Sequence, residues 1–176
     1  PVREKAPWVG SARVLWKENF ILKFVEIKNL TKAAQRIKKA IADNDYKGRY
    51  YGVYPIKVNQ LREVVEEILD AGEPYQFGLE AGSKGELMAV VAMNAPDRLT
   101  LVNGYKDESM MRLALIGVKA GKRIIVVIEK LSELDALLRV GREMGVRPLI
   151  GLRSRLRAKG SGKWKSSSGD LAKFGL

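Results

Sequence analysis

The sequence predicts an α/β fold, a partial TIM-type (β/α) barrel of about five parallel βα units preceded by a short strand and a helix. Strand-like runs alternate with helical patterns at a spacing of about 25 residues, which fits a strand, a turn and a three-turn helix. Several runs are continuously apolar, such as Ile124–Ile128, as in parallel strands covered on both faces. No Gly-x-Gly-x-x-Gly follows the first strand, and the spacing never reverses, so a barrel is favoured over a doubly wound sheet.

Two elements precede the repeating units. Ala12–Leu15 is typical of a short strand, and Ile27–Asp43 of a helix. We therefore expect residues 1–26 to form an N-terminal β-element or linker and residues 27–176 to form a partial barrel that is truncated at its C-terminus. An eight-stranded barrel needs about three more units, and the chain does not begin with Met. Both observations favour a segment of a longer protein.

The strands of the array are predicted from β-branched and aromatic runs. They are Tyr50–Ile56, Tyr75–Leu79, Arg98–Val102, Arg123–Ile128 and Arg147–Leu152. The first helix of the array, Gln60–Ala71, places its apolar residues on one stripe and should end at Gly72.

Capping residues mark the other helices. Ser83 and Glu86 form a Ser-x-x-Glu capping box for a helix that ends at Met93. Asp107 should begin the third helix of the array. Ser132 lies near the start of the fourth, and Gly145 should end it.

Composition excludes several classes of active site. The chain of 176 residues contains neither Cys nor His, so disulfides, thiol nucleophiles, Ser-His-Asp triads and His-ligated metals are impossible within it. Acid–base chemistry must use Lys, Tyr, Asp or Glu. No apolar run approaches the roughly 20 residues of a membrane span, and no secretory signal is present. We therefore expect a cytoplasmic protein without membrane contact.

The net charge is +12, and the clearest cluster of basic residues lies in one Gly/Ser-rich segment around Trp164. Its basic residues are Arg153, Arg155, Arg157, Lys159, Lys163 and Lys165. Basic side chains beside a stacking aromatic can bind nucleic acid. A solvated surface loop is favoured, because no known nucleic-acid-binding motif accompanies the cluster.

Lys57 is the strongest candidate for chemistry. It interrupts an apolar strand near its carboxyl end, which faces the ligand-binding side of a strand–helix array. A buried amine at this place is easily deprotonated and can form a Schiff base. The alternative is a lysine that extends from the strand end into water.

Four segments in order resemble the biosynthetic arginine decarboxylase family, pyridoxal-phosphate enzymes of the alanine-racemase-like fold type III. They are Val53–Gln60, Gly78–Leu87, Asn103–Asp107, and Gly160–Trp164 with Lys173–Leu176. The resemblance covers about residues 46–176 well and residues 1–45 loosely.

The resemblance implies that Lys57 binds pyridoxal 5'-phosphate as a Schiff base and that the whole protein converts L-arginine to agmatine and CO₂ for polyamine (spermidine) synthesis. It further implies Mg²⁺ and a homo-oligomer. Glu80 would lie beside the cofactor, or else pair with Lys84. Arg153 would contact the cofactor ring, or else belong to the basic loop. Residues 161–169 resemble a loop that closes over the site.

The family's stacking histidine, phosphate-binding loop and second-subunit residues would lie beyond Leu176, so we expect the chain alone to be inactive. Two alternatives remain. One is a decarboxylase of ornithine, lysine or diaminopimelate on the same scaffold. The other is a non-catalytic basic binding domain, against which the retention of Lys57 argues.

Overall fold

The computed structural model describes residues 31–154 and 175–176. It divides the chain into two compact units, with the boundary between Tyr50 and Tyr51. In the first unit, residues 31–43 are helical, which agrees with the described part of the predicted helix. The predicted strand Ala12–Leu15, the domain boundary at residue 26, and the basic segment and closing loop from residue 155 to residue 174 lie outside the described residues.

The second unit contains a five-stranded sheet in which every neighbouring pair of strands is parallel. The strand order follows the chain, β1-β2-β3-β4-β5. The strands are β1 (Val53–Pro55), β2 (Gly78–Ala81), β3 (Leu99–Val102), β4 (Arg123–Ile128) and β5 (Leu149–Leu152). A sheet that never reverses direction winds in the manner of a barrel wall, as predicted.

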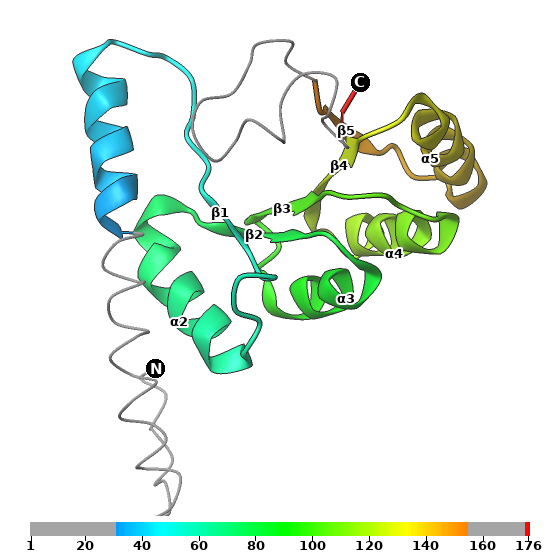
Figure 1. Cartoon of the computed structure of the whole chain (residues 1–176), viewed down its shortest axis with the longest axis horizontal. Coiled ribbons are helices and arrows are strands. Elements are labelled where there is room, and N and C mark those ends of the chain that lie inside the picture. The colour runs from blue at the N-terminus through cyan, green and yellow to red at the C-terminus, as the bar shows by residue number, and fades with distance from the viewer. Residues whose placement is uncertain (1–30, 155–174) are drawn as a thin grey trace, which may run out of the picture. The chain divides into compact units, whose positions relative to one another are not determined.

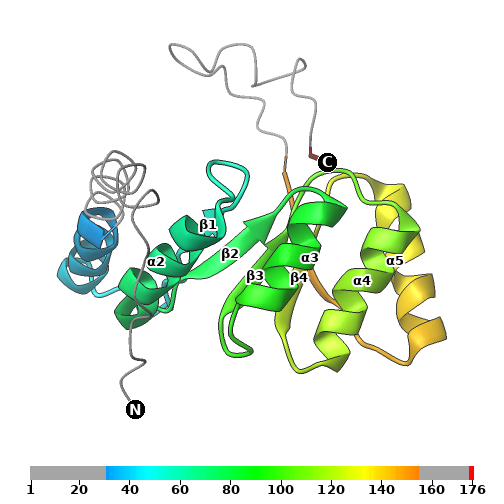
Figure 2. The same ribbon diagram turned by 90° about the horizontal axis from the view of Figure 1, so that it is seen from below.

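Helices connect the strands and lie along one side of the sheet (Figures 1 and 2). They are α2 (Arg62–Gly72), followed by the 3₁₀ turn η1 (Glu73–Tyr75), α3 (Lys84–Met93), α4 (Glu108–Lys119) and α5 (Leu131–Met144). Their apolar faces and alternate strand residues form the core. In β4, Ile124, Val126 and Ile128 are almost fully buried.

The other face of the sheet is less covered than its apolar runs suggest. The residues of β4 alternate between intermediate and full burial, and Leu149, Ile150 and Leu152 of β5 are exposed. The expectation of burial on both faces is therefore wrong for the described residues, because the helices cover only one face.

Three of the predicted caps are confirmed. The hydroxyl of Ser83 accepts a hydrogen bond from the Glu86 N–H (3.3 Å), and the Asp107 carboxylate accepts one from Met110 (2.7 Å). Gly145 has φ of 63°, the left-handed conformation that suits a glycine after a helix.

The helix α2 ends at Gly72, as predicted, but Gly72 does not adopt the left-handed conformation of a glycine C-cap. Gly72 stays right-handed as the last residue of α2, and the chain continues into η1. The left-handed residue is Gln76 instead, with φ of 55°. Tyr75 consequently lies in η1, and β2 begins later than predicted, at Gly78.

The first strand is shorter than predicted. β1 ends at Pro55, where a turn begins, and the Val58 N–H donates to the Pro55 carbonyl (3.1 Å). β1 is an edge strand, where proline is tolerated because one side of the strand needs no ladder hydrogen bonds.

Candidate functional site

The carboxyl ends of the five strands lie at one edge of the sheet, because all strands are parallel. The structure places the three predicted site residues there. Lys57 follows β1, Glu80 lies within β2 and Arg153 follows β5. In strand–helix barrels this edge carries the ligand site.

Lys57 lies in the turn after β1 and is exposed. The sequence predicted a buried amine, and this is wrong because the strand ends two residues earlier. Its neighbour Ile56 takes the buried position. Among the described residues, the Lys57 ammonium has no hydrogen bond or ion pair, so the amine is accessible to a ligand at the strand end.

Glu80 is half-buried in β2, beside Pro55 of β1 in the parallel register. Its carbonyl accepts a hydrogen bond from the Ile56 N–H (3.2 Å), which joins it to the turn carrying Lys57. The alternative partner is wrong: Lys84 lies 3.4 Å from an Asp107 carboxylate oxygen and also donates to Ser109. The Glu80 carboxylate therefore remains available at the edge.

Arg153 is anchored at the end of β4. Its backbone N–H donates to the Ile128 carbonyl (3.2 Å), and its Nη1 lies 3.2 Å from Oε1 of Glu129. The Arg153 side chain is 48% exposed, whereas the Glu129 side chain is fully buried. This ion pair distinguishes Arg153 from a residue of a solvated basic loop.

Glu129 connects several strand ends through one carboxylate. Its Oε1 accepts a second hydrogen bond from the Gly104 N–H (3.1 Å), after β3. Its own N–H donates to Oε2 of Glu133 (2.8 Å). Its Oε2 is buried and has no hydrogen-bond partner among residues 31–154 and 175–176.

Lys106 and Glu133 complete this group, which we call the strand-end cluster: Lys106, Glu129, Glu133 and Arg153. The Lys106 Nζ lies 3.2 Å from Oε2 of Glu133 and also donates to the Gly104 carbonyl. The Lys106 N–H donates to the other Glu133 oxygen (3.0 Å). Burial lowers the pKa of Lys106, and the charge of Glu133 opposes that shift.

Gly104 is required at its position by conformation and by space. Its φ is +75°, and a Cβ there would approach the Gly82 carbonyl oxygen to 2.9 Å. The Asn103 N–H donates to the Ala81 carbonyl (2.8 Å) nearby. The loops after β2 and β3 are thereby held together, and Gly104 also donates its N–H to Glu129.

The structure brings only part of the predicted site together. Lys57 and Glu80 belong to neighbouring strands, whereas β5, which precedes Arg153, lies at the other end of the strand order from β1. The sequence analysis missed Glu129, although a charged residue directly after the apolar run Ile124–Ile128 is the same signal that identified Lys57.

A cavity of about 250 Å³ in the described residues lies away from this edge. It is lined by Glu66, Leu69, Asp70, Glu73, Phe77, Met93, Ala95 and Arg98, near the starts of β2 and β3. The described residues include no group of three or more His, Cys, Asp or Glu side chains placed to hold a metal, and none of their helices is long and apolar enough to cross a membrane.

Comparisons with known proteins point to one family. The family model of pyridoxal-dependent decarboxylases, pyridoxal binding domain, matches residues 27–176. Over 159 residues the chain is 48% identical to a biosynthetic arginine decarboxylase of Phocaeicola vulgatus, covering 89% of the chain and 25% of that protein. It is 54% identical over 142 residues to one from Vibrio cholerae, covering 78% and 22%.

A solved structure is similar as well. The crystal structure of the biosynthetic arginine decarboxylase SpeA from Campylobacter jejuni superposes with a TM-score of 0.72 at 35% identity, covering 85% of this chain and 23% of that one. The chain thus spans about a quarter of the length of these relatives. The chain belongs to the pyridoxal-dependent decarboxylase family, in its pyridoxal-binding domain, and is a homologue of the biosynthetic arginine decarboxylases.

Proposed function

We propose that the whole protein decarboxylates L-arginine to agmatine and CO₂, with Lys57 as the residue that binds pyridoxal phosphate. The observation that supports this assignment most directly is the exposed Lys57 amine at the carboxyl edge of a parallel sheet, in a chain of this family. The substrate is inferred from the identity to arginine decarboxylases, because the described residues show no partner for a substrate guanidinium.

The residues at the edge fit the chemistry of pyridoxal phosphate. The cofactor, when bound, supplies a ring that accepts electrons as the substrate loses CO₂. Lys57 offers an accessible primary amine for the cofactor aldehyde. Arg153 offers a half-exposed guanidinium whose Nη1 contacts Glu129, and a guanidinium suits an anionic oxygen on the ring. Glu80 offers a carboxylate on the strand beside Lys57.

The remaining proposals follow from similarity to the family. We infer a requirement for Mg²⁺, a homo-oligomeric enzyme, a cytoplasmic location and a role in polyamine synthesis. The described residues include no group of three or more His, Cys, Asp or Glu side chains placed to hold a metal, so the Mg²⁺ proposal rests on the family alone.

The test uses the full-length protein reconstituted with pyridoxal phosphate. We expect release of CO₂ from carboxyl-labelled L-arginine, with ornithine, lysine and diaminopimelate turned over more slowly. Borohydride reduction followed by peptide mapping should place the cofactor on Lys57. A faster reaction with another of these amino acids would reassign the substrate.

A pair of variants separates Lys57 from other lysines. Lys57→Ala should abolish turnover and cofactor labelling, because no other amine occupies the turn after β1. Lys119→Ala is the matched control, an exposed lysine in the last turn of α4. Retained turnover in Lys57→Ala, or labelling of another lysine, would contradict the assignment.

A further inference from the structure

We propose that Glu129 is a positioning residue that holds the Arg153 guanidinium in place for pyridoxal phosphate; this inference rests on the proposed function. Glu129 immediately follows β4 and is buried, with 2% exposure. Its Oε1 contacts groups that follow both flanking strands, the Gly104 N–H after β3 and the Arg153 guanidinium after β5. One carboxylate therefore sets the spacing of three strand ends.

The position of Arg153 is fixed at more than one point. Its N–H donates to the Ile128 carbonyl (3.2 Å), its carbonyl accepts from the Leu176 N–H (2.8 Å), and its side chain is held by Glu129. A guanidinium that is already restrained loses little side-chain entropy when a ligand binds. Arg153 is thus preorganised for an anion, while nearly half of its side-chain surface stays exposed.

The burial of Glu129 explains why its carboxylate should hold the Arg153 guanidinium. A buried charge is costly unless it is paired and hydrogen-bonded. The Oε1 of Glu129 accepts hydrogen bonds from Gly104 and Arg153, whereas its Oε2 is buried and accepts none from the residues that the structure describes. Arg153 is the cation in direct contact with Glu129. Loss of either partner should release the other.

The first experiment measures the affinity of the full-length protein for pyridoxal phosphate by titration after cofactor removal. Glu129→Gln keeps the shape and an acceptor for Gly104 but removes the charge. It should weaken binding roughly tenfold, because the hydrogen bond from Arg153 would then go to a neutral amide oxygen and not to a carboxylate. In the Arg153→Gln background the same change should have no further effect. Equal weakening in both backgrounds would overturn the proposal, because Glu129 would then act independently of Arg153.

The second experiment needs no cofactor. A dicarbonyl reagent modifies accessible guanidinium groups, and peptide mapping gives the rate at Arg153 relative to Arg142, an exposed arginine without an ion pair among the described residues. Glu129→Gln should raise this ratio several-fold. Glu108→Gln, a charge removal on the surface of α4, should leave it unchanged. An unchanged ratio in Glu129→Gln would refute the anchoring role.

Folding and the proposed function are controlled separately. Circular dichroism checks that each variant is folded. If Glu129→Gln does not fold, Glu129→Asp keeps the buried charge but retracts it by one methylene, and it should also raise the Arg153 ratio. If the unsubstituted protein binds no pyridoxal phosphate, the proposed function fails, while the labelling ratio still decides whether Glu129 positions Arg153.

Discussion

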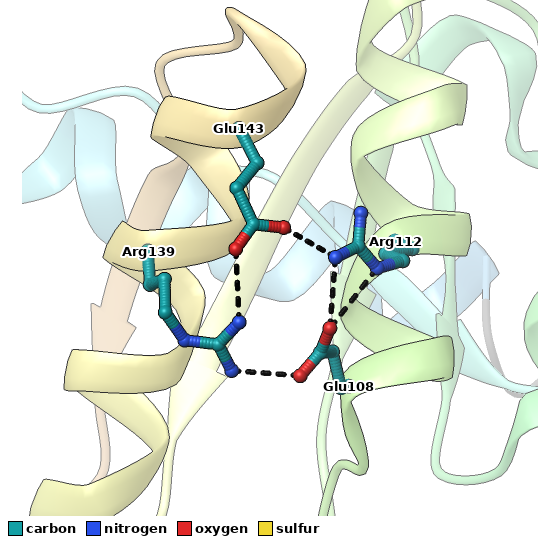
Figure 3. A network of polar contacts seen from close by, with 4 residues as sticks. All are labelled: Glu108, Arg112, Arg139 and Glu143. Carbon is teal, nitrogen blue, oxygen red and sulfur yellow. Dashed lines mark hydrogen bonds and ion pairs between the residues drawn. The ribbon is translucent and has the colours of Figure 1, made fainter.

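Two clusters in this molecule have the same composition, two acids and two bases, but opposite environments. The strand-end cluster of Lys106, Glu129, Glu133 and Arg153 is largely buried. The second, which we call the interhelical cluster, joins α4 and α5 on the surface and consists of Glu108, Arg112, Arg139 and Glu143 (Figure 3).

The interhelical cluster is a closed ring of ion pairs. Glu108 lies 2.8 Å from Arg112 and 2.7 Å from Arg139, and Glu143 lies 3.0 Å from Arg139 and also contacts Arg112. All four side chains are 40–49% exposed. Water and salt screen such charges, so good geometry contributes little stability there.

The strand-end cluster uses its charges differently. Its carboxylates accept backbone N–H groups from Gly104, Lys106 and Glu129 as well as the side-chain cations. These groups have few alternative partners once buried. We therefore expect burial and backbone hydrogen bonds to decide how much each ion pair contributes to stability, more than the distance between its charged atoms does.

The largest expected effect is the loss of a buried partner. Glu133→Gln leaves Lys106 as a buried ammonium without its counter-charge. We expect a loss of about 3–5 kcal/mol in the free energy of unfolding, measured by urea denaturation. Adding Lys106→Met to this variant should recover much of the loss. If Glu133→Gln alone is as stable as the parent chain, the buried ion pair with Lys106 contributes no more than an exposed one.

A smaller effect is expected at Gly104. Gly104→Ala places a Cβ at φ of +75° and 2.9 Å from the Gly82 carbonyl oxygen. The strain should reduce stability by about 1–3 kcal/mol. Gly121→Ala is the matched control, with φ of +82° and no heavy atom within 4 Å of the added Cβ. If both variants lose the same stability, the approach to Gly82 contributes nothing.

The interhelical cluster should respond weakly to mutation. Arg139→Gln removes two of its ion pairs, both exposed. We expect a thermal shift smaller than that of Gly104→Ala, and one that disappears in about 1 M salt, where the Debye length is roughly 3 Å. A large shift that persists at high salt would show that exposure does not weaken this network.

The smallest effect is a pH dependence. Hydrogen bonds from Arg139 and Arg112 lower the pKa of Glu108 from 4.5 to about 2. Because the folded-state pKa is lower, the unfolded chain binds more protons between these values. The stabilisation by Glu108 is therefore present above about pH 4.5 and is lost as the pH falls through about 2.

Denaturation of the parent chain and Glu108→Gln as a function of pH checks this prediction. The difference in the free energy of unfolding between the parent chain and Glu108→Gln should become smaller as the pH falls. A difference that is constant from neutral pH to about pH 2 would mean that Glu108 titrates alike in both states.

The strand–helix order was predictable because it depends on local periodicity. The caps at Ser83, Asp107 and Gly145 were found for the same reason: each depends on its own backbone and near neighbours. The left-handed cap expected at Gly72 is absent because a 3₁₀ turn follows α2, and Gln76 after that turn adopts the left-handed conformation. The rule that a glycine caps a helix does not distinguish these two ways in which a helix ends.

The candidate site was predictable in part. The sequence indicated Lys57, Glu80 and Arg153 at strand ends, and parallel pairing places all three at one edge. It also placed Lys57 in a buried position and offered a pairing with Lys84 as the alternative role of Glu80. Both were wrong, because burial and pairing depend on where β1 ends and on which loop Lys84 reaches.

The sequence by itself determined the βα repeat, the one-directional winding, the absence of cysteine and histidine chemistry within these 176 residues, and the place of Lys57 after the first strand of the array. Only the tertiary structure decided that Glu129 joins Gly104 to Arg153 and that Lys106 is buried against Glu133. These contacts link residues 24 to 27 positions apart. Periodicity describes neighbours along the chain, whereas the register of parallel strands decides which distant charges meet and which of them lose water.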